Sequence, residues 1–445
     1  MTFTPAPHSA GWPHPARAWW AVAVLTFAYI VSFIDRTAMS LLIEPIKADL
    51  NLSDVQIALL QGAAFGVFYT VMGLPLGWLA DRKNRIRLIM VGATLWCLAT
   101  ALCGLARNFA QMFLARIGVG VGEAALSPSA LSIISDNFPK ERRGLPIAVY
   151  SMAVSLGTGL ALVIGGGVIQ MVNAAPPISL PVIGAVAGWQ AVFIVIGLGG
   201  LTLIPLLATV REPARRNEDI APGAGVSAEI EKPRLWPFLL ANRDFFGRHY
   251  GGLAVCSLLI AGVLSWAPAY FIRVHGWSAG ETGLRYGLMF MICGPLGTVG
   301  AGYLSGVLAR RGVRGAALMI TGGGVLLATL PLALAGFAVD GWTALTWFSL
   351  AMVLFAAPGG VAVQALQEVC PNALRGQAAA LYFFAANMIG MTFGPLIVAT
   401  LTEQVFSDPM AIGKSLGVLA IVIGPVSGLI LLSGYRGYRR MTEAK

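Results

Sequence analysis

The stretch Gly77-Trp78-Leu79-Ala80-Asp81-Arg82-Lys83-Asn84-Arg85 forms a short basic turn between two long apolar runs. The runs cover residues 53–80 and 86–106. A helix needs about 20 predominantly apolar residues to cross the hydrocarbon core of a bilayer, and both runs are long enough. We therefore expect two membrane-spanning helices here, joined by a charged loop at the membrane surface.

The rest of the 445-residue chain continues this pattern. It is 57% hydrophobic and only 11% charged, with a mean hydropathy of +0.76, whereas soluble domains carry about 25% charged residues. This composition excludes a soluble multidomain protein and predicts an all-α membrane protein with twelve transmembrane helices. The expected spans are 18–46, 53–80, 86–106, 110–136, 144–171, 188–209, 247–273, 279–308, 316–337, 342–368, 374–402 and 412–433.

The positions of the 30 lysines and arginines predict the orientation of these spans. If the amino terminus is cytoplasmic, the opposite side of the membrane receives only Lys47, Arg107, Arg273 and Lys414. Because cytoplasmic loops are enriched in positive charge, we expect both termini in the cytoplasm. The net charge of +10 then reflects topology, and we expect no nucleic-acid partner.

One stretch of the chain is polar and rich in proline and glycine, which is typical of a linker. It separates two sets of six spans. The expected organisation is a cytoplasmic tail (1–17), a six-helix bundle (18–210), a cytoplasmic linker (211–243), a second six-helix bundle (244–434) and a cytoplasmic tail (435–445).

The two sets of spans are related by an internal repeat. Four positions at the end of span 110–136 recur, 232 residues later, at the end of span 342–368. The pairs are Asp136 and Glu368, Pro139 and Pro371, Arg143 and Arg375, and Gly144 and Gly376, and Tyr150 and Tyr382 extend the match. Repeated halves around a site near the middle of the membrane are typical of secondary transporters.

With these features the chain resembles the major facilitator superfamily. The resemblance rests on the two six-helix halves, the long central loop and the basic turn from Gly77 to Arg85, and it covers essentially the whole chain. It implies a transporter that opens a central site alternately to the two sides of the membrane. The second half has Gly306 where Asp81 would correspond, so only the first copy of the turn keeps the acidic residue.

Charged side chains inside the bilayer are costly, so ionisable groups within the spans are functional candidates. Asp35 and Arg36 lie in the first span, and Arg116 and Glu123 lie in the fourth. At about 1.5 Å per residue, Asp35 and Arg116 come to similar depths in the membrane. We expect these two side chains to form an ion pair, which leaves Glu123 as a second carboxylate nearer the cytoplasm.

A carboxylate that faces a cavity beside an arginine can exchange a proton as access alternates. Asp35 and Glu123 are therefore the expected proton-coupling residues, and an inert ion pair between helices is the alternative. Arg36 points about 100° away from Asp35 on the helix, so it either binds substrate or contacts another helix. The glycines of the 116–123 run are spaced as in a dinucleotide-binding turn, but the strand that precedes such a turn is absent. We therefore expect these glycines to allow membrane helices to approach closely.

A second group of charges lies at the predicted cytoplasmic ends of the spans. Ion pairs among them would form in an outward-open state and break in an inward-open one, which makes these residues candidates for a cytoplasmic gate. Solvated charges that only set the topology are the alternative. The candidates are Asp81, Arg82, Arg85, Asp136, Arg143, Glu368 and Arg375.

The second half is poor in charge within its spans, where only Arg285 lies well inside a predicted helix. Tyr382 and Asn387 are among its notable polar side chains. A cavity with one charged wall and one apolar wall suits an amphiphile better than a sugar. The expected substrate-binding residues are Arg36, Arg116, Tyr382 and Asn387.

The chain also resembles the spinster family, most strongly over residues 30–160. The segments that carry the resemblance are Phe33-Ile34-Asp35-Arg36, Leu52-Ser53-Asp54-Val55-Gln56 and Gly122-Glu123-Ala124. Members of that family are lipid transporters, associated with sphingosine-1-phosphate export and lysophospholipid efflux. The resemblance implies that Asp35 and Glu123 are protonated during transport and that Arg116 has a head-group or coupling role. The short loops are typical of a bacterial member, located in the inner membrane.

Two other functions stay open. One is an organic-anion:proton symporter of the same superfamily, since some of those also carry an Asp-Arg pair in the first span and a Gly-x-Gly-Glu-Ala run in the fourth. The other is a receptor or an enzyme, which no nucleophile–base pair, metal cluster or cofactor loop supports. We expect a monomer without enzymatic activity, cofactor or metal. Its expected partners are protons, the lipid bilayer and a lipid-like or anionic small molecule.

Overall fold

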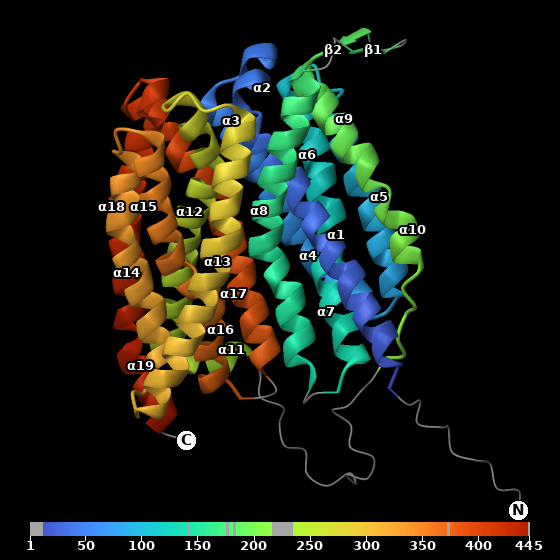
Figure 1. Cartoon of the computed structure of the whole chain (residues 1–445). Helices are drawn as coiled ribbons and strands as arrows, with labels where there is room; N and C mark the ends of the chain where they lie inside the picture. Colours follow the sequence, from blue (N-terminus) through green and yellow to red (C-terminus); the bar gives the residue numbers. More distant parts are fainter. Residues whose placement is uncertain are drawn as a thin grey trace, which may run out of the picture.

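The computed structural model describes residues 12–139, 142–174, 178–180, 184–215, 235–371 and 374–443. Within these residues, eleven helices are long and apolar enough to span a membrane. The remaining expected span, 342–368, the tenth along the chain, is divided between two shorter helices that meet at Ala356. The predicted all-α membrane fold is confirmed, and Figure 1 shows its two halves side by side.

Parts of the predicted tails and linker lie outside the described residues. They are residues 1–11 of the amino-terminal tail, 216–234 of the linker and 444–445 of the carboxyl-terminal tail. The boundaries of these segments therefore stay predictions.

The first half contains several interrupted spans and one small hairpin, in which β1 and β2 pair antiparallel. Its elements are α1 (Pro15–Leu41), α2 (Ile43–Leu50), α3 (Asp54–Gln61), the π-turn η1 (Ala63–Val67), α4 (Phe68–Ala80), α5 (Arg85–Cys103), α6 (Phe109–Glu123), α7 (Leu126–Asn137), α8 (Gly144–Ala174), β1 (Ile178–Leu180), β2 (Gly184–Val186), α9 (Gly188–Gly200) and α10 (Leu203–Ala208).

The second half is built from longer, more continuous helices. Its elements are α11 (Leu235–Ala241), α12 (Arg243–Arg273), α13 (Ala279–Arg310), α14 (Ala316–Gly336), α15 (Gly341–Phe355), α16 (Ala357–Val369), α17 (Arg375–Thr400), the π-turn η4 (Leu401–Val405), the short 3₁₀ turn η5 (Pro409–Ala411), α18 (Ile412–Ser433) and α19 (Tyr435–Glu443).

Polar side chains at the helix starts determine where the spans begin. The side chain of Asn84 accepts a hydrogen bond from the Arg87 amide at 2.8 Å, so α5 starts directly after the basic turn. Ser53 starts α3 with a capping box, in which its side chain and that of Gln56 each bind the other's backbone amide. Such caps satisfy amide groups that a helix start leaves unpaired.

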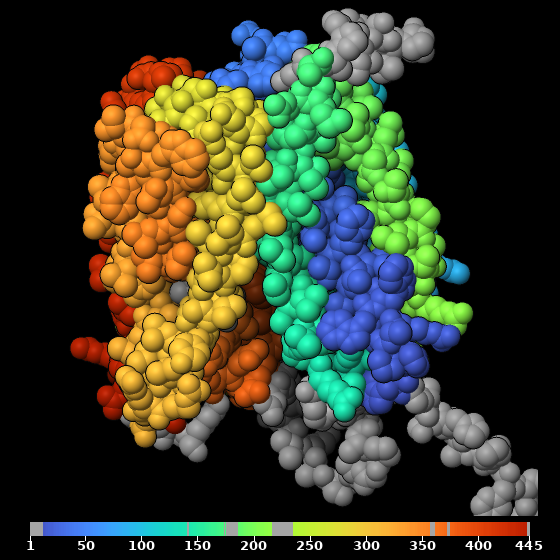
Figure 2. Space-filling view, in the orientation of Figure 1, coloured from blue at the N-terminus to red at the C-terminus, as the bar shows by residue number. Residues whose placement is uncertain are grey.

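Both ends of the described chain lie on the same side of the molecule, which we call the terminal side (Figure 1). The opposite side, which carries α2 and the β1–β2 hairpin, is called the far side. Helix α8 of the first half runs beside α13 of the second. The space-filling view in Figure 2 shows their surfaces in contact along this seam.

Candidate functional site

An ion pair between α1 and α6 forms the centre of the candidate site. Arg36 donates from Nε to Glu123 Oε2 at 2.6 Å, and its Nη2 lies 2.5 Å from the same oxygen. The Glu123 side chain is fully buried, and that of Arg36 is 17% exposed. Because separating the two would leave a buried charge without its partner, the pair holds α1 and α6 together at this depth.

Three aromatic rings surround the same guanidinium. The ring centroids of Phe33, Phe65 and Tyr69 lie 5.1, 4.7 and 4.7 Å from its central carbon. A cation is attracted to the face of an aromatic ring at such distances. The rings therefore bind the guanidinium beside its carboxylate partner and give this part of the site an apolar wall.

Phe65 reaches the site because the second span is irregular there. It lies in η1, where the helix widens into a π-turn, a feature that is frequent at functional sites. Gly120 of α6 allows this turn to come close, since a Cβ at Gly120 would lie 2.6 Å from the Phe65 carbonyl oxygen. The predicted close approach along the 116–123 glycine run is confirmed.

Arg116 is buried near the same rings, but it does not pair with Asp35 as predicted. Its Nε donates to the Leu60 carbonyl at 3.4 Å, and the Phe65 centroid lies 5.3 Å from its guanidinium carbon. The predicted pairing is wrong because an estimate of depth cannot distinguish two neighbouring residues. Arg36 is the one that faces α6, and its long side chain reaches Glu123.

Two carboxylate oxygens of the site have no hydrogen-bond donor among the described residues. They are Oδ2 of Asp35, a residue that is 1% exposed, and Oε1 of Glu123. Buried polar atoms in folded proteins are nearly always hydrogen-bonded. These two oxygens are therefore places where a proton, a water molecule or a donor group of a ligand can bind.

The aromatic surroundings of the site were not predicted from the sequence. Besides the rings already named, Tyr29 stacks on Tyr150 at 5.0 Å and so joins α1 to α8. The available signal was the spacing of Tyr29 and Phe33, and of Phe65 and Tyr69. Residues four apart share one face of a helix, but apolar spans contain many aromatic residues and this spacing alone did not single them out.

On the terminal side, Arg85 forms a buried network within the first half. Its guanidinium binds Asp136, donates to Glu212 Oε1 at 2.6 Å and to Ser132 Oγ at 2.9 Å, and donates to the Pro213 carbonyl at 3.0 Å. Glu212 was missed, because it lies 127 residues from Arg85 in the sequence. The network joins α5, α7 and the segment after α10.

The other gate candidates of the first half also bind within that half. Arg82 stacks on the Trp78 ring, with its guanidinium carbon 3.9 Å from the centroid. Asp81 is exposed, and its backbone carbonyl accepts a hydrogen bond from Arg215. Arg143 donates from Nε to the Phe138 carbonyl at 2.7 Å.

The gate candidates of the second half mirror this arrangement in part. Arg375 donates from Nε to the Cys370 carbonyl at 3.3 Å, which repeats the Arg143 contact 232 residues later. Glu368 accepts hydrogen bonds from the Tyr438 hydroxyl and, at 3.0 Å, from Gln364. The internal repeat therefore has a structural counterpart. Whether these residues form a gate between the halves stays a prediction.

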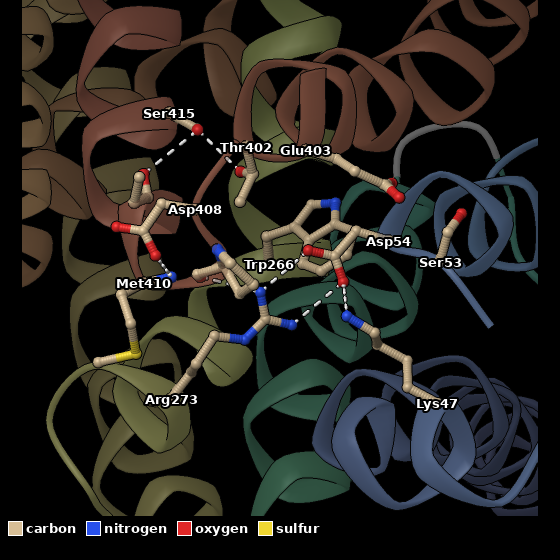
Figure 3. Close-up of polar contacts among 12 residues, drawn as sticks. Lys47, Ser53, Asp54, Trp266, Arg273, Thr402, Glu403, Asp408, Met410 and Ser415 are labelled. Atoms are coloured by element: carbon tan, nitrogen blue, oxygen red, sulfur yellow. Dashed lines mark hydrogen bonds and ion pairs between the residues drawn. The ribbon is translucent and has the colours of Figure 1, made fainter. Parts of the chain in front are cut away.

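On the far side, charged residues join the two halves directly, as Figure 3 shows. Arg273 of α12 lies 2.6 Å from Glu44 Oε1 and 2.9 Å from Asp54 Oδ2, and Lys47 also binds Asp54. Glu403 of η4 accepts a hydrogen bond from the Val55 amide at 3.0 Å. We call this set, Glu44, Lys47, Asp54, Arg273 and Glu403, the inter-half clamp. From the sequence, Lys47 and Arg273 were expected only as charges on the side of the membrane opposite the termini.

Tyr382 and Asn387 both lie in α17 but differ in their surroundings. Tyr382 packs against a buried cluster of the second half that includes Leu253 and Cys256. Asn387 lies one helical turn from Met391. Met391 packs on the first half, since a Cβ added to Gly66 would lie only 2.8 Å from the Met391 Cβ. Residues four apart share a helix face, so Asn387 is the one on the face toward the first half.

Within the described ranges, no group of three His, Cys, Asp or Glu side chains is placed as metal ligands would be. The titratable side chains of the site are instead arranged as an ion pair, a buried arginine and a buried aspartate.

The chain matches a known protein family over most of its length. The Major Facilitator Superfamily matches residues 25–395. An "MFS-type efflux pump" of Mycolicibacterium smegmatis is 30% identical over 429 residues, which cover 96% of this chain and 94% of that protein. A probable L-galactonate transporter of Escherichia coli is 30% identical over 304 residues, covering 66% of this chain and 62% of that protein.

The likeness to spinster proteins is found as well. Protein spinster of Drosophila melanogaster is 25% identical over 301 residues, which cover 66% of this chain and 46% of that protein. A crystal structure of a bacterial homologue of the human lysosomal transporter Spinster, inward-facing and unoccupied, superposes with a TM-score of 0.78. It is 24% identical, and the match covers 97% of this chain and 98% of that one. The predicted resemblance is confirmed.

Proposed function

The chain belongs to the Major Facilitator Superfamily, and we propose that it is a proton-coupled secondary transporter of an amphiphile with an anionic head group. The observation that carries this proposal is the Arg36–Glu123 ion pair, next to Asp35 of α1, whose Oδ2 has no hydrogen-bond donor in the part of the chain that the structure describes. Ionisable groups inside a membrane are costly and mark substrate and proton pathways in transporters.

The ion pair supplies a means of coupling. An anionic head group that binds Arg36 replaces Glu123 as the partner of the guanidinium. Glu123 is then a buried carboxylate without a cation, a state that a proton neutralises. Asp35 is the second proton-binding candidate, and Arg116 is a second cation for the head group. Substrate binding and protonation are thereby linked. The head group takes Arg36 away from Glu123, and the proton neutralises the charge that Glu123 would otherwise keep without a partner.

The surroundings of the pair favour an apolar tail on the substrate. Phe33, Phe65 and Tyr69 cover Arg36 on several sides, and the described spans of the second half offer Asn387 rather than further charges on the α17 face. The resemblance to the spinster family, which the chain's similarity to spinster proteins bears out, implies a substrate of this kind, a lysophospholipid or a sphingoid-phosphate-like lipid.

We also propose that the halves move relative to each other in alternating access, as bundles 18–210 and 244–434 of a monomer. The lysine and arginine distribution supports a cytoplasmic terminal side. The similarity to bacterial proteins supports a bacterial inner membrane. The inter-half clamp then closes the outer side. In the outward-open state, contacts between the halves would close the cytoplasmic side instead. The proposed residues for these contacts are Asp81, Arg82, Arg143, Glu368 and Arg375.

A sugar-acid:proton symporter is the second candidate function. It is favoured by the 30% identity to a protein described as a probable L-galactonate transporter. A carboxylate substrate would use Arg36 and Arg116 in the same way as a phosphate head group, because both anions form charge-assisted hydrogen bonds with a guanidinium.

The experiment is transport in reconstituted liposomes under an imposed pH gradient, with a labelled lysophospholipid and a labelled sugar acid offered separately. Wild type is compared with Asp35→Asn and with the control Asp244→Asn, which changes an exposed acid on the terminal side. We expect gradient-dependent lipid movement that Asp35→Asn abolishes and Asp244→Asn preserves. Movement of the sugar acid alone would favour the second candidate. Unchanged coupling in Asp35→Asn would remove Asp35 from the mechanism.

A further inference from the structure

A cavity lies far from the Arg36–Glu123 pair, on the terminal side of the first half. Its volume is about 330 Å³. It opens between the start of α1, the end of α7 and the segment after α10, and Figure 1 shows the lower end of α1 beside that segment. Its lining includes Arg17, Trp20, Asp136, Thr209, Arg211 and Glu212.

The charges around this cavity leave it basic. Both acidic lining residues, Asp136 and Glu212, already bind the buried guanidinium of Arg85. Arg17 and Arg211 are exposed, and neither forms an ion pair with the part of the chain that the structure describes. Two arginines of one cavity lining that lack counter-ions among the described residues can bind an anion.

The start of α1 also has the features of a membrane interface. Trp19 and Trp20 are 37% and 47% exposed, and Trp20 Nε1 donates at 2.9 Å to Thr209 Oγ1, another residue of the cavity lining. Tryptophan is enriched where the hydrocarbon core meets the lipid head groups. Just beyond these rings, α1 continues into the apolar residues of the first span. The cavity is therefore at the level of the head groups.

We propose that this cavity binds the head group of an anionic phospholipid from the surrounding leaflet. The phosphate lies between Arg17 and Arg211, and the acyl chains extend along the apolar faces of α1 and α10. Basic pockets between transmembrane helices on the cytoplasmic side bind lipid head groups in this way. The bound lipid would join the start of α1 to the end of α10, and it is distinct from the transported substrate.

The test uses the full-length protein, delipidated in detergent and titrated with phosphatidylglycerol, with bound lipid counted by native mass spectrometry. Each arginine near an anionic membrane surface contributes about a fivefold gain in affinity. The double variant Arg17→Gln/Arg211→Gln is therefore expected to bind roughly 25-fold more weakly. The matched control Arg310→Gln/Arg311→Gln removes two arginines from the terminal side of the second half and is expected to bind as wild type does.

Equal affinity of wild type and the Arg17/Arg211 variant would overturn the proposal. Wild type alone supplies a second test, which holds even if the variant fails to fold. We expect it to bind phosphatidylglycerol in preference to phosphatidylcholine and to be stabilised against heat by phosphatidylglycerol more than by inorganic phosphate. No preference between the two lipids, or equal stabilisation by inorganic phosphate, would show that the cavity is not a phospholipid site.

Discussion

Gly159 of α8 and Gly287 of α13 face each other across the seam between the halves, and the backbone of each leaves no room for a side chain on the other. A Cβ on Gly159 would lie 2.5 Å from the Gly287 carbonyl oxygen, and a Cβ on Gly287 would lie 2.5 Å from the Gly159 carbonyl oxygen. Small residues allow membrane helices to approach this closely. The two halves therefore approach closely at this point of the seam, with the backbone of each helix within reach of the other.

We expect Gly287→Ala to disturb this seam. The added methyl group has no room, and overpacking of a buried contact costs typically about 1–3 kcal/mol. The variant should unfold at lower temperature in detergent and transport more slowly in liposomes. Gly300→Ala is the matched control on the same helix, since a Cβ there meets nothing within 4 Å. Equal effects of the two substitutions would show that the close approach at Gly287 is unimportant.

Arg85→Gln is expected to destabilise the first half. The substitution leaves Asp136 and Glu212 without the buried guanidinium that binds both. Breaking a buried ion pair by removing one partner costs about 3–5 kcal/mol. The measurement is the thermal unfolding temperature of the purified protein. Arg82→Gln, which changes an exposed arginine of the same turn, should lower it far less. Similar shifts for both variants would contradict a structural role of the Arg85 network.

Asp54→Asn is expected to loosen the inter-half clamp, because Arg273 and Lys47 both lose their shared carboxylate. Hydrogen bonds to charged groups contribute about 1.5–3 kcal/mol each, so the far side should open in a measurable fraction of molecules. Spin labels at Ala48→Cys and Met410→Cys, on the two halves, would report a longer or broader distance distribution.

The control for the clamp is Glu281→Gln. Glu281 is exposed and pairs with Arg285 of its own helix, so its loss should leave the label distances unchanged. Distances in Asp54→Asn that match wild type would mean that the clamp does not hold the far side closed.

Much of the fold could be predicted because its causes are local. The length of each apolar run determines a span, and charged or capping residues such as Asn84 determine where it ends. The repeat was visible in Arg143 and Arg375, and their equivalent backbone contacts confirm it. The close packing at the glycine run 116–123 followed from residue size alone.

The site was predicted less completely, because its partners depend on side-chain direction and on distant segments. The four charged residues were identified, but two neighbours on α1 could not be told apart by depth, and the pair joins Glu123 to Arg36 rather than Arg116 to Asp35. The π-turn that brings Phe65 to Arg36 has no composition signal. The clamp pairs residues from opposite halves, such as Asp54 and Arg273, which no periodicity relates.

The coupling between Arg36 and Glu123 can be measured by a double-mutant cycle. Arg36→Gln and Glu123→Gln each leave the other charge buried without its partner, so each should destabilise the protein by about 3–5 kcal/mol. The double variant buries no uncompensated charge. Its loss in free energy of unfolding should therefore be clearly smaller than the sum of the losses of the two single variants. Stability is measured by reversible unfolding in mixed micelles, on the same preparations used for transport.

The same cycle at Asp244 and Arg248 is the control. These residues form an exposed pair one helical turn apart in α12, with side chains 47% and 41% exposed. Pairs of this kind couple by about 0.3–0.5 kcal/mol. A strong coupling at Arg36–Glu123 beside a weak one at Asp244–Arg248 is the expected result. Additive losses at Arg36 and Glu123 would mean that the two charges do not depend on each other, and a substrate anion would then gain nothing by displacing one from the other.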